Sequence, residues 1–212
     1  MESKITLAVA RQVAELLKKN KNFDVKMTRN SDVALTLKER AELALKNHGD
    51  LFVSIHANSS PDRRAKGAEF FFQNQLPPDS ETMFLARREL HHHGHNTDEE
   101  RLAFGPRHNN AYVASILEDI IRNRSIQESA RLSESLVEEW DGTLKPKKHV
   151  IQQAPFYVIS NVPMPSVLVE LGFLTHQKEG KLLSTSAHQY KLANSIYKGI
   201  LKFKESMDKP PR

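Results

Sequence analysis

The chain of 212 residues contains no cysteine. It therefore has no disulfide framework and no thiolate metal site, so a zinc ion could be held only by histidine and carboxylate side chains. No stretch approaches the roughly 18 apolar residues that a membrane-spanning helix needs, and we expect no membrane span. We also expect no signal peptide, because Met1 leads almost at once into an amphipathic helical pattern. No internal repeat is visible.

Charge of one sign is not concentrated anywhere in the chain. The 31 lysines and arginines exceed the 26 acidic residues, which gives a net charge of +5. A basic chain raises the question of nucleic-acid binding, but there is no basic stripe interleaved with aromatics and no nucleic-acid motif. We expect no nucleic-acid partner and a solvated surface with some attraction to anionic polymers.

Helical and extended patterns alternate through the first third of the chain. Residues 4–19 place apolar side chains on one helical face, and Phe23–Thr28 resembles a strand. Thr36 and Glu39 form a capping box at the start of a second helix, and Gly49 is expected to close it in the left-handed conformation. Further strands are predicted at 51–55, 67–72, 154–159 and 167–171, followed by a C-terminal helix. This order predicts a single α/β domain with a twisted mixed sheet flanked by helices.

The composition changes between residues 76 and 146. Residues 76–110 are polar and interrupted by prolines, and they include the run His91–His95. Residues 111–140 have a helical pattern that Asn123–Ser125 could break in two. We predict one domain over residues 1–212 with a largely helical insertion at about 76–146.

Two short segments carry the chemistry. Ser54-Ile55-His56-Ala57-Asn58 and Val169-Glu170-Leu171-Gly172-Phe173 each close an apolar run and place His56 or Glu170 at the end of a strand. Ligands of open α/β sheets gather at the carboxyl ends of strands. Histidine is a ready zinc ligand, and a carboxylate among apolar neighbours has a raised proton affinity suited to a general base. The pair predicts a metal-assisted hydrolase, although His56 alone could equally be a strand-end histidine that bonds a loop.

Together with Gly67-Ala68-Glu69, these motifs resemble the zinc-dependent N-acetylmuramoyl-L-alanine amidases of the bacterial cell wall. The resemblance covers residues 2–72 and roughly 150–203. It implies hydrolysis of the amide between N-acetylmuramic acid and L-alanine, with Zn²⁺ as cofactor, His56 and Glu2 as metal ligands and Glu170 as the catalytic base. Without the resemblance, Glu2 would be read as a carboxylate favoured at a helix N-terminus.

The sequence departs from the family at one ligand. The family has a histidine ligand on a loop after a first strand, upstream of the glutamate, and this chain begins at Met1-Glu2. Three explanations stay open: a shortened chain, a substitute such as His93 or His95, and a catalytically inactive relative. The run His91–His95 either binds metal or forms a solvated loop. Glu69 either supports the site or lies on the exposed face of an edge strand.

The resemblance also implies a cellular role. In the cell-division members of the family an inserted segment covers the active site until a partner protein moves it. Residues 76–146, with Glu118 or another acidic side chain, are placed for such an autoinhibitory lid, a hypothesis that deletion of residues 76–110 would test through the amidase rate. The implied substrate is peptidoglycan and the implied location is the periplasm or cell wall. The alternatives are an inactive peptidoglycan-binding or regulatory relative and another zinc amidohydrolase or peptidase.

Overall fold

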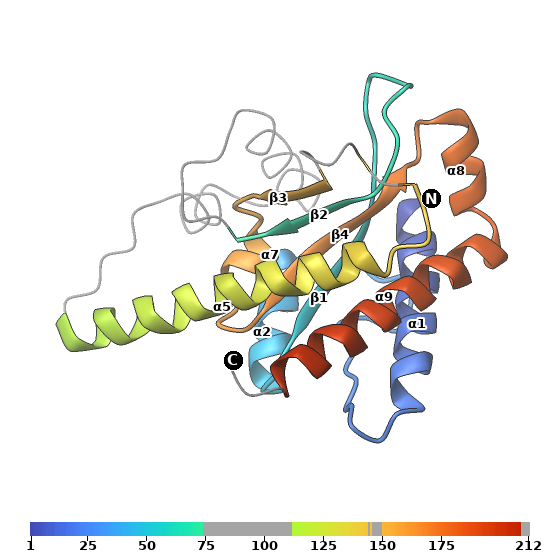
Figure 1. Ribbon diagram of the computed structural model, residues 1–212. Coiled ribbons are helices and arrows are strands. Elements are labelled where there is room, and N and C mark those ends of the chain that lie inside the picture. Colours follow the sequence, from blue (N-terminus) through green and yellow to red (C-terminus); the bar gives the residue numbers. More distant parts are fainter. Residues whose placement is uncertain (74–111, 144, 146–149, 209–212) are drawn as a thin grey trace.

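The computed structural model describes residues 1–73, 112–143, 145 and 150–208 (Figure 1). Its helices are α1 (Glu2–Lys18), α2 (Leu37–Lys46), α5 (Tyr112–Glu138), α7 (Tyr157–Ser160), α8 (Gln177–Leu183) and α9 (Ser186–Met207). Its strands are β1 (Phe52–Asn58), β2 (Glu69–Phe72), β3 (Ile151–Gln153) and β4 (Ser166–Phe173).

The described strands form one mixed sheet in the order β1-β4-β2-β3. β4 is parallel to β1 and antiparallel to β2, and β2 is parallel to β3. Every residue of β4 is buried, because the strand has a neighbour on each side and helices over both faces. The predicted α/β domain with a mixed sheet flanked by helices is confirmed.

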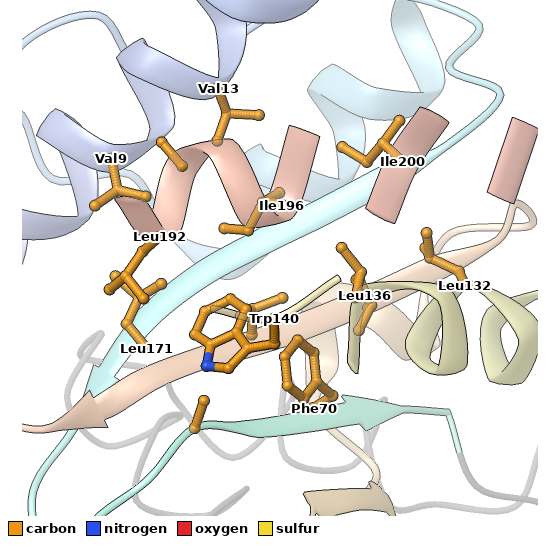
Figure 2. Close-up of a cluster of buried hydrophobic side chains, with 14 of the residues drawn as sticks. Val9, Val13, Phe70, Leu132, Leu136, Trp140, Leu171, Leu192, Ile196 and Ile200 are labelled. Atoms are coloured by element: carbon orange, nitrogen blue, oxygen red, sulfur yellow. The ribbon is translucent and has the colours of Figure 1, made fainter. Parts of the chain in front are cut away.

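One face of the sheet packs against α1, α5 and α9, and this layer holds the larger core (Figures 1 and 2). Phe70 of β2 meets the ring of Trp140 edge to face, with centroids 5.2 Å apart. Figure 2 shows side chains of all three helices converging on the sheet, among them Val9, Val13, Leu132, Leu136, Leu192, Ile196 and Ile200. Burying these groups supplies most of the free energy that holds the layers together.

The opposite face of the sheet packs against α2 and α7. Phe71 of β2 meets Phe156 at a centroid distance of 5.1 Å, and Leu37 of α2 is fully buried. The capping box predicted for α2 is present, since the amide of Glu39 donates to the Thr36 hydroxyl and the amide of Thr36 donates to the Glu39 carboxylate. This helix therefore begins where the sequence indicated.

The end of α2 differs from the prediction by one residue. The left-handed residue is His48, with φ of 50°, and not Gly49. The amide of Gly49 bonds the carbonyl of Ala44, and the amide of His48 bonds that of Leu45. This is the pairing of a Schellman motif, in which the residue before the last donor takes the left-handed conformation.

Three further predictions of local structure were wrong. Residues 23–28 are extended, but no described strand lies beside them to form a ladder. The strand expected at 154–159 is β3 at Ile151–Gln153 followed by the short helix α7, because Pro155 has no amide hydrogen to continue a ladder. Helix α5 runs unbroken through Asn123–Ser125, where no proline or glycine interrupts it.

The predicted insertion lies largely outside the described residues, including the run His91–His95, so its role as a lid stays a prediction. The described part shows that the second half of α5 belongs to the core, since Leu132, Leu136 and Trp140 are buried against the sheet and α9. Among the helices of the described ranges, none is long and apolar enough to cross a membrane.

A bulge follows Glu170 in β4. The register pairs His56 with Glu170 but Asn58 with Phe173, so β4 carries an extra residue between these pairs. Gly172 lies in this bulge with φ of 143°. The Glu179 carboxylate packs against Gly172 and accepts hydrogen bonds from the amides of Phe173 and Gly67. Bulges of this kind bend a strand and redirect its side chains next to active sites.

We expect Gly172→Ala to lower the free energy of unfolding by about 2 kcal/mol or more, because its φ is strained for an L side chain. An added Cβ would also lie 2.7 Å from Cδ of Glu179. Urea unfolding measures the change. Gly49→Ala is the control, since the one tight contact of its Cβ would be the flexible Met164 sulfur at 3.2 Å, and the backbone oxygens of Ala44 and Leu51 lie at ordinary contact distances. Equal losses in the two variants would contradict the account of the bulge.

Candidate active site

Three polar side chains form a row across the middle of the sheet. Glu170 of β4 is the register partner of His56 in β1 and of Glu69 in β2. Directly opposed residues of neighbouring strands project from the same face, and this parity places the row on the α2 and α7 side. We call His56, Glu170 and Glu69 the cross-strand row. The sequence predicted two of its members at strand ends, and the sheet places them side by side.

Glu2 joins the row from the first turn of α1. Its Oε1 lies 3.5 Å from Nδ1 of His56 and accepts a hydrogen bond from the amide of Ala57 at 3.3 Å. The His56 side chain is 14% exposed and that of Glu2 is 45% exposed, so the pair borders solvent. The structure therefore brings together the two residues that the sequence analysis named as metal ligands.

The geometry of this pair fits two ligands of one zinc ion. Ligand atoms about 2.1 Å from a tetrahedral zinc lie about 3.4 Å apart, and the Glu2 Oε1 to His56 Nδ1 separation is 3.5 Å. Nε2 of His56 lies 2.9 Å from the Ser54 hydroxyl. Metal-binding histidines commonly donate their second ring nitrogen to such a partner, which fixes the ring and its tautomer. With Nε2 directed at Ser54, Nδ1 is the ring nitrogen that faces Glu2.

The described residues bring together two candidate ligands and not a complete set. Within the part of the chain that the structure describes, no group of three or more histidine, cysteine or acidic side chains is arranged to hold a metal ion. A catalytic zinc site usually has three protein ligands. His93 and His95, the substitutes considered from the sequence, lie outside the described residues.

Glu69 is buried at the inner end of the row. It is 1% exposed. Its carboxylate accepts hydrogen bonds from Asn58 Nδ2 at 3.1 Å and from Gln152 Nε2 at 3.2 Å. Lys145 Nζ lies 3.2 Å from its Oε1. The expectation of an exposed edge-strand residue is therefore wrong, because β3 covers the outer side of β2. Glu69 is a structural anion that joins three strands to the segment after α5.

Lys145 supplies positive charge to one of two facing carboxylates, Glu69. Glu69 and Glu170 are directly opposed on antiparallel strands, where like charges repel. Glu170 is 8% exposed, so water screens this repulsion weakly. The ammonium group of Lys145 contacts Glu69 and lies 5.0 Å from the centre of the Phe173 ring. Sequence reasoning missed Lys145, since nothing near it in the chain indicates a buried partner.

Three further polar side chains in this part of the molecule have structural roles. His176 caps α8, where its Nδ1 accepts the amide of Glu179. Arg29 donates to the carbonyl of Ser3 and lies 3.9 Å from Asp32, which ties the segment after α1 to the start of that helix. Arg40 donates to the carbonyl of Leu35. None of the three belongs to the cross-strand row.

A family model described as N-acetylmuramoyl-L-alanine amidase matches residues 1–202. The chain belongs to the N-acetylmuramoyl-L-alanine amidase family. The resemblance inferred from the motifs around His56 and Glu170 is thereby confirmed. AmiA of Salmonella typhimurium, itself named N-acetylmuramoyl-L-alanine amidase, is 30% identical over 203 residues, which are 95% of this chain and 68% of AmiA.

Solved amidase structures share the fold. The catalytic domain of CwlV from Bacillus (Paenibacillus) polymyxa var. colistinus superposes with a TM-score of 0.66 at 24% identity, over 97% of this chain and 86% of that one. The CwlD amidase of Clostridioides difficile, solved in complex with the GerS lipoprotein, gives a TM-score of 0.67 at 24% identity over 97% and 87%. At this identity the likeness establishes the fold.

We expect Lys145→Met to destabilise the protein by about 3 kcal/mol, because it leaves the buried charge of Glu69 without its cation. Thermal unfolding of the variant gives the change. Lys191→Met is a matched control, since Lys191 pairs with Asp141 on the surface, where the Asp141 side chain is 74% exposed. Such surface pairs contribute about 0–1 kcal/mol. A loss no larger than the control's would show that Lys145 does not compensate Glu69.

Proposed function

We propose that this chain hydrolyses the amide bond between N-acetylmuramic acid and L-alanine in peptidoglycan, with zinc as its cofactor. The observation that carries the proposal is the cross-strand row beside Glu2: a potential base, Glu170, next to a histidine whose ring nitrogen and a carboxylate oxygen are spaced as zinc ligands. The family membership and the activity for which AmiA is named support the same reaction.

In this proposal, Glu2 and His56 hold the metal, and Ser54 keeps the imidazole ring in the tautomer that leaves Nδ1 to bind it. When bound, a zinc ion supplies Lewis acidity that makes water nucleophilic near neutral pH. The Glu2 side chain is exposed to solvent, so a metal ion and the substrate can reach the site from this side.

Glu170 moves the proton. Its carboxylate takes a proton from the water that attacks the lactyl carbonyl of N-acetylmuramic acid, and it returns that proton to the alanine nitrogen as the carbon–nitrogen bond breaks. The products are a free carboxylate on the sugar and a free amino group on the stem peptide. The buried position of Glu170 supports this role, because a carboxylate with little contact to water exchanges its proton with the substrate and not with bulk solvent.

We also propose that the reaction takes place outside the cytoplasm, in the periplasm or cell wall, where peptidoglycan lies. The CwlD relative was solved with a lipoprotein bound. That complex supports the prediction that a protein partner acts on this chain, and a role in cell division remains part of the same hypothesis.

One observation favours a second candidate function. The described residues contain no group of three side chains arranged to hold a metal ion, as expected of an inactive peptidoglycan-binding or regulatory relative. Such a protein would bind cell-wall sacculi saturably and release no new amino groups of L-alanine. A zinc peptidase is separated by its products, because it would cleave the free stem peptide without the sugar.

We expect Glu170→Gln to reduce the release of L-alanine amino groups from purified muropeptides by about 100-fold or more, since the amide cannot accept the proton. Glu205→Gln, on the exposed face of α9, is the matched control and should retain full activity. The zinc content of both variants is measured in parallel. Full activity of Glu170→Gln would remove Glu170 as the base, and no release by the unaltered chain would favour the binding relative.

A further inference from the structure

Glu179 is a buried carboxylate whose hydrogen bonds leave its own helix. It is the third residue of α8 and is 8% exposed. Its Oε2 accepts the amide of Phe173 at 2.7 Å, and its Oε1 accepts the amide of Gly67 at 3.0 Å. Hydrogen bonds to an ionised acceptor are about twice as strong as those between neutral groups. The carboxylate therefore holds two distant segments firmly, and Figure 1 shows α8 beside the loop that joins β1 and β2.

Another helix of the chain shows the ordinary task of a glutamate at this position. Glu39 is the third residue of α2, is exposed, and accepts the amide of Thr36 in a capping box. In α8 the equivalent amide, that of His176, donates to the carbonyl of Phe173 instead. The cap is supplied by Nδ1 of His176, which accepts the amide of Glu179. The carboxylate of Glu179 thus serves other segments and not its own helix.

Both amides lie at irregular points of strands that carry the cross-strand row. Among the described residues, Gly67 and Gly172 are the glycines with positive φ, at 96° and 143°. The carboxylate accepts the amide of Gly67 itself and the amide of Phe173, directly after Gly172. Gly67 lies two residues before Glu69, and Phe173 lies three residues after Glu170. One side chain therefore fastens the backbone next to two facing members of the row.

The position of the bulge decides which way Glu170 points. A bulge interrupts the ladder and leaves an extra residue unpaired, so an acceptor from outside the sheet fixes where that residue sits. If the extra residue moved to the other side of Glu170, this side chain would lose its register with His56. Because side chains alternate along a strand, the carboxylate would then face α1 and α9.

We propose that Glu179 is a positioning residue of the active site, which holds the bulge at Gly172 and so keeps Glu170 beside His56. Glu179 acts through the main chain and does not contact the substrate. Its effect on rate rests on the proposed function, whereas its effect on the placement of Glu170 does not. Glu2 and His56 lie on α1 and β1, outside the two segments that the carboxylate fastens, so zinc binding should not depend on Glu179.

Glu179→Gln tests the proposal, because it has the shape of glutamate but turns an NH₂ group toward a main-chain donor. We expect kcat for the release of L-alanine amino groups to fall by about tenfold or more, since a small misplacement of a catalytic group costs that much. KM and the zinc dissociation constant should stay close to those of the unaltered chain, because the loss affects the transition state. Glu179→Asp, which keeps the charge with a shorter reach, replaces this variant if it does not fold.

A second readout needs no activity. Glu170 and His56 are register partners, so their side-chain protons should give a nuclear Overhauser contact in the unaltered chain. Glu179→Gln should weaken or abolish this contact. Formate, added to Glu179→Ala, supplies a carboxylate of the size of the lost group and should restore part of both the contact and kcat.

Two controls separate positioning from stability. Glu39→Gln changes the same helix position in α2 and should keep both the contact and kcat. Ile196→Ala removes a fully buried side chain of the core on the opposite face of the sheet. It should lower the melting temperature without changing kcat at temperatures where the variant is folded.

An unchanged kcat in Glu179→Gln, or an equal fall in Ile196→Ala, would overturn the positioning role. If the unaltered chain released no amino groups, the proposed function would fail and the Overhauser contact would decide. A contact between Glu170 and His56 that persists unchanged in Glu179→Gln would overturn the inference in that case too.

Discussion

The pairing of β4 with β1 on one side and β2 on the other is the constraint on which the site depends. It places His56, Glu170 and Glu69 in one row, although they lie far apart in the chain. A shift of one residue in either register would turn Glu170 away from His56 and into the core under α1 and α9. The full burial of β4 makes such a shift costly, since it would exchange the apolar and polar faces of the strand.

The structure stabilises its buried acidic groups with specific partners. Glu69 has a lysine and two amide side chains around it, and Glu179 accepts main-chain amides at the bulge. Glu69 belongs to the cross-strand row, and Glu179 of α8 bonds the bulge that follows Glu170, so the scaffold holds these charges in fixed positions around Glu170. Glu2 and His56, by contrast, meet at the border with solvent, where a metal ion and a polymeric substrate can approach.

Local sequence patterns were enough to predict the fold class and the two strands that carry His56 and Glu170, because apolar runs and capping residues act over a few positions. The capping box of Thr36 and Glu39 at the start of α2 is an example. The failures came from partners distant in sequence. Residues 23–28 have a strand pattern, but a ladder needs a neighbouring strand. An exposed position was one of two predictions for Glu69, because nothing in the sequence shows that β3 returns beside β2 or that Lys145 reaches the carboxylate. Glu2 was assigned through the family resemblance, and the structure supplied the contact with His56.

Zinc-edge X-ray absorption of the tag-free chain tests the central claim most directly. The account predicts a first shell of nitrogen and oxygen atoms only, with an imidazole contribution that His56→Ala removes and His188→Ala leaves in place. Glu2→Ala should lower the zinc affinity and change the oxygen part of the same shell. An imidazole signal that is unchanged in His56→Ala would show that the metal is held elsewhere, and it would contradict the assignment of Glu2 and His56 as the metal ligands.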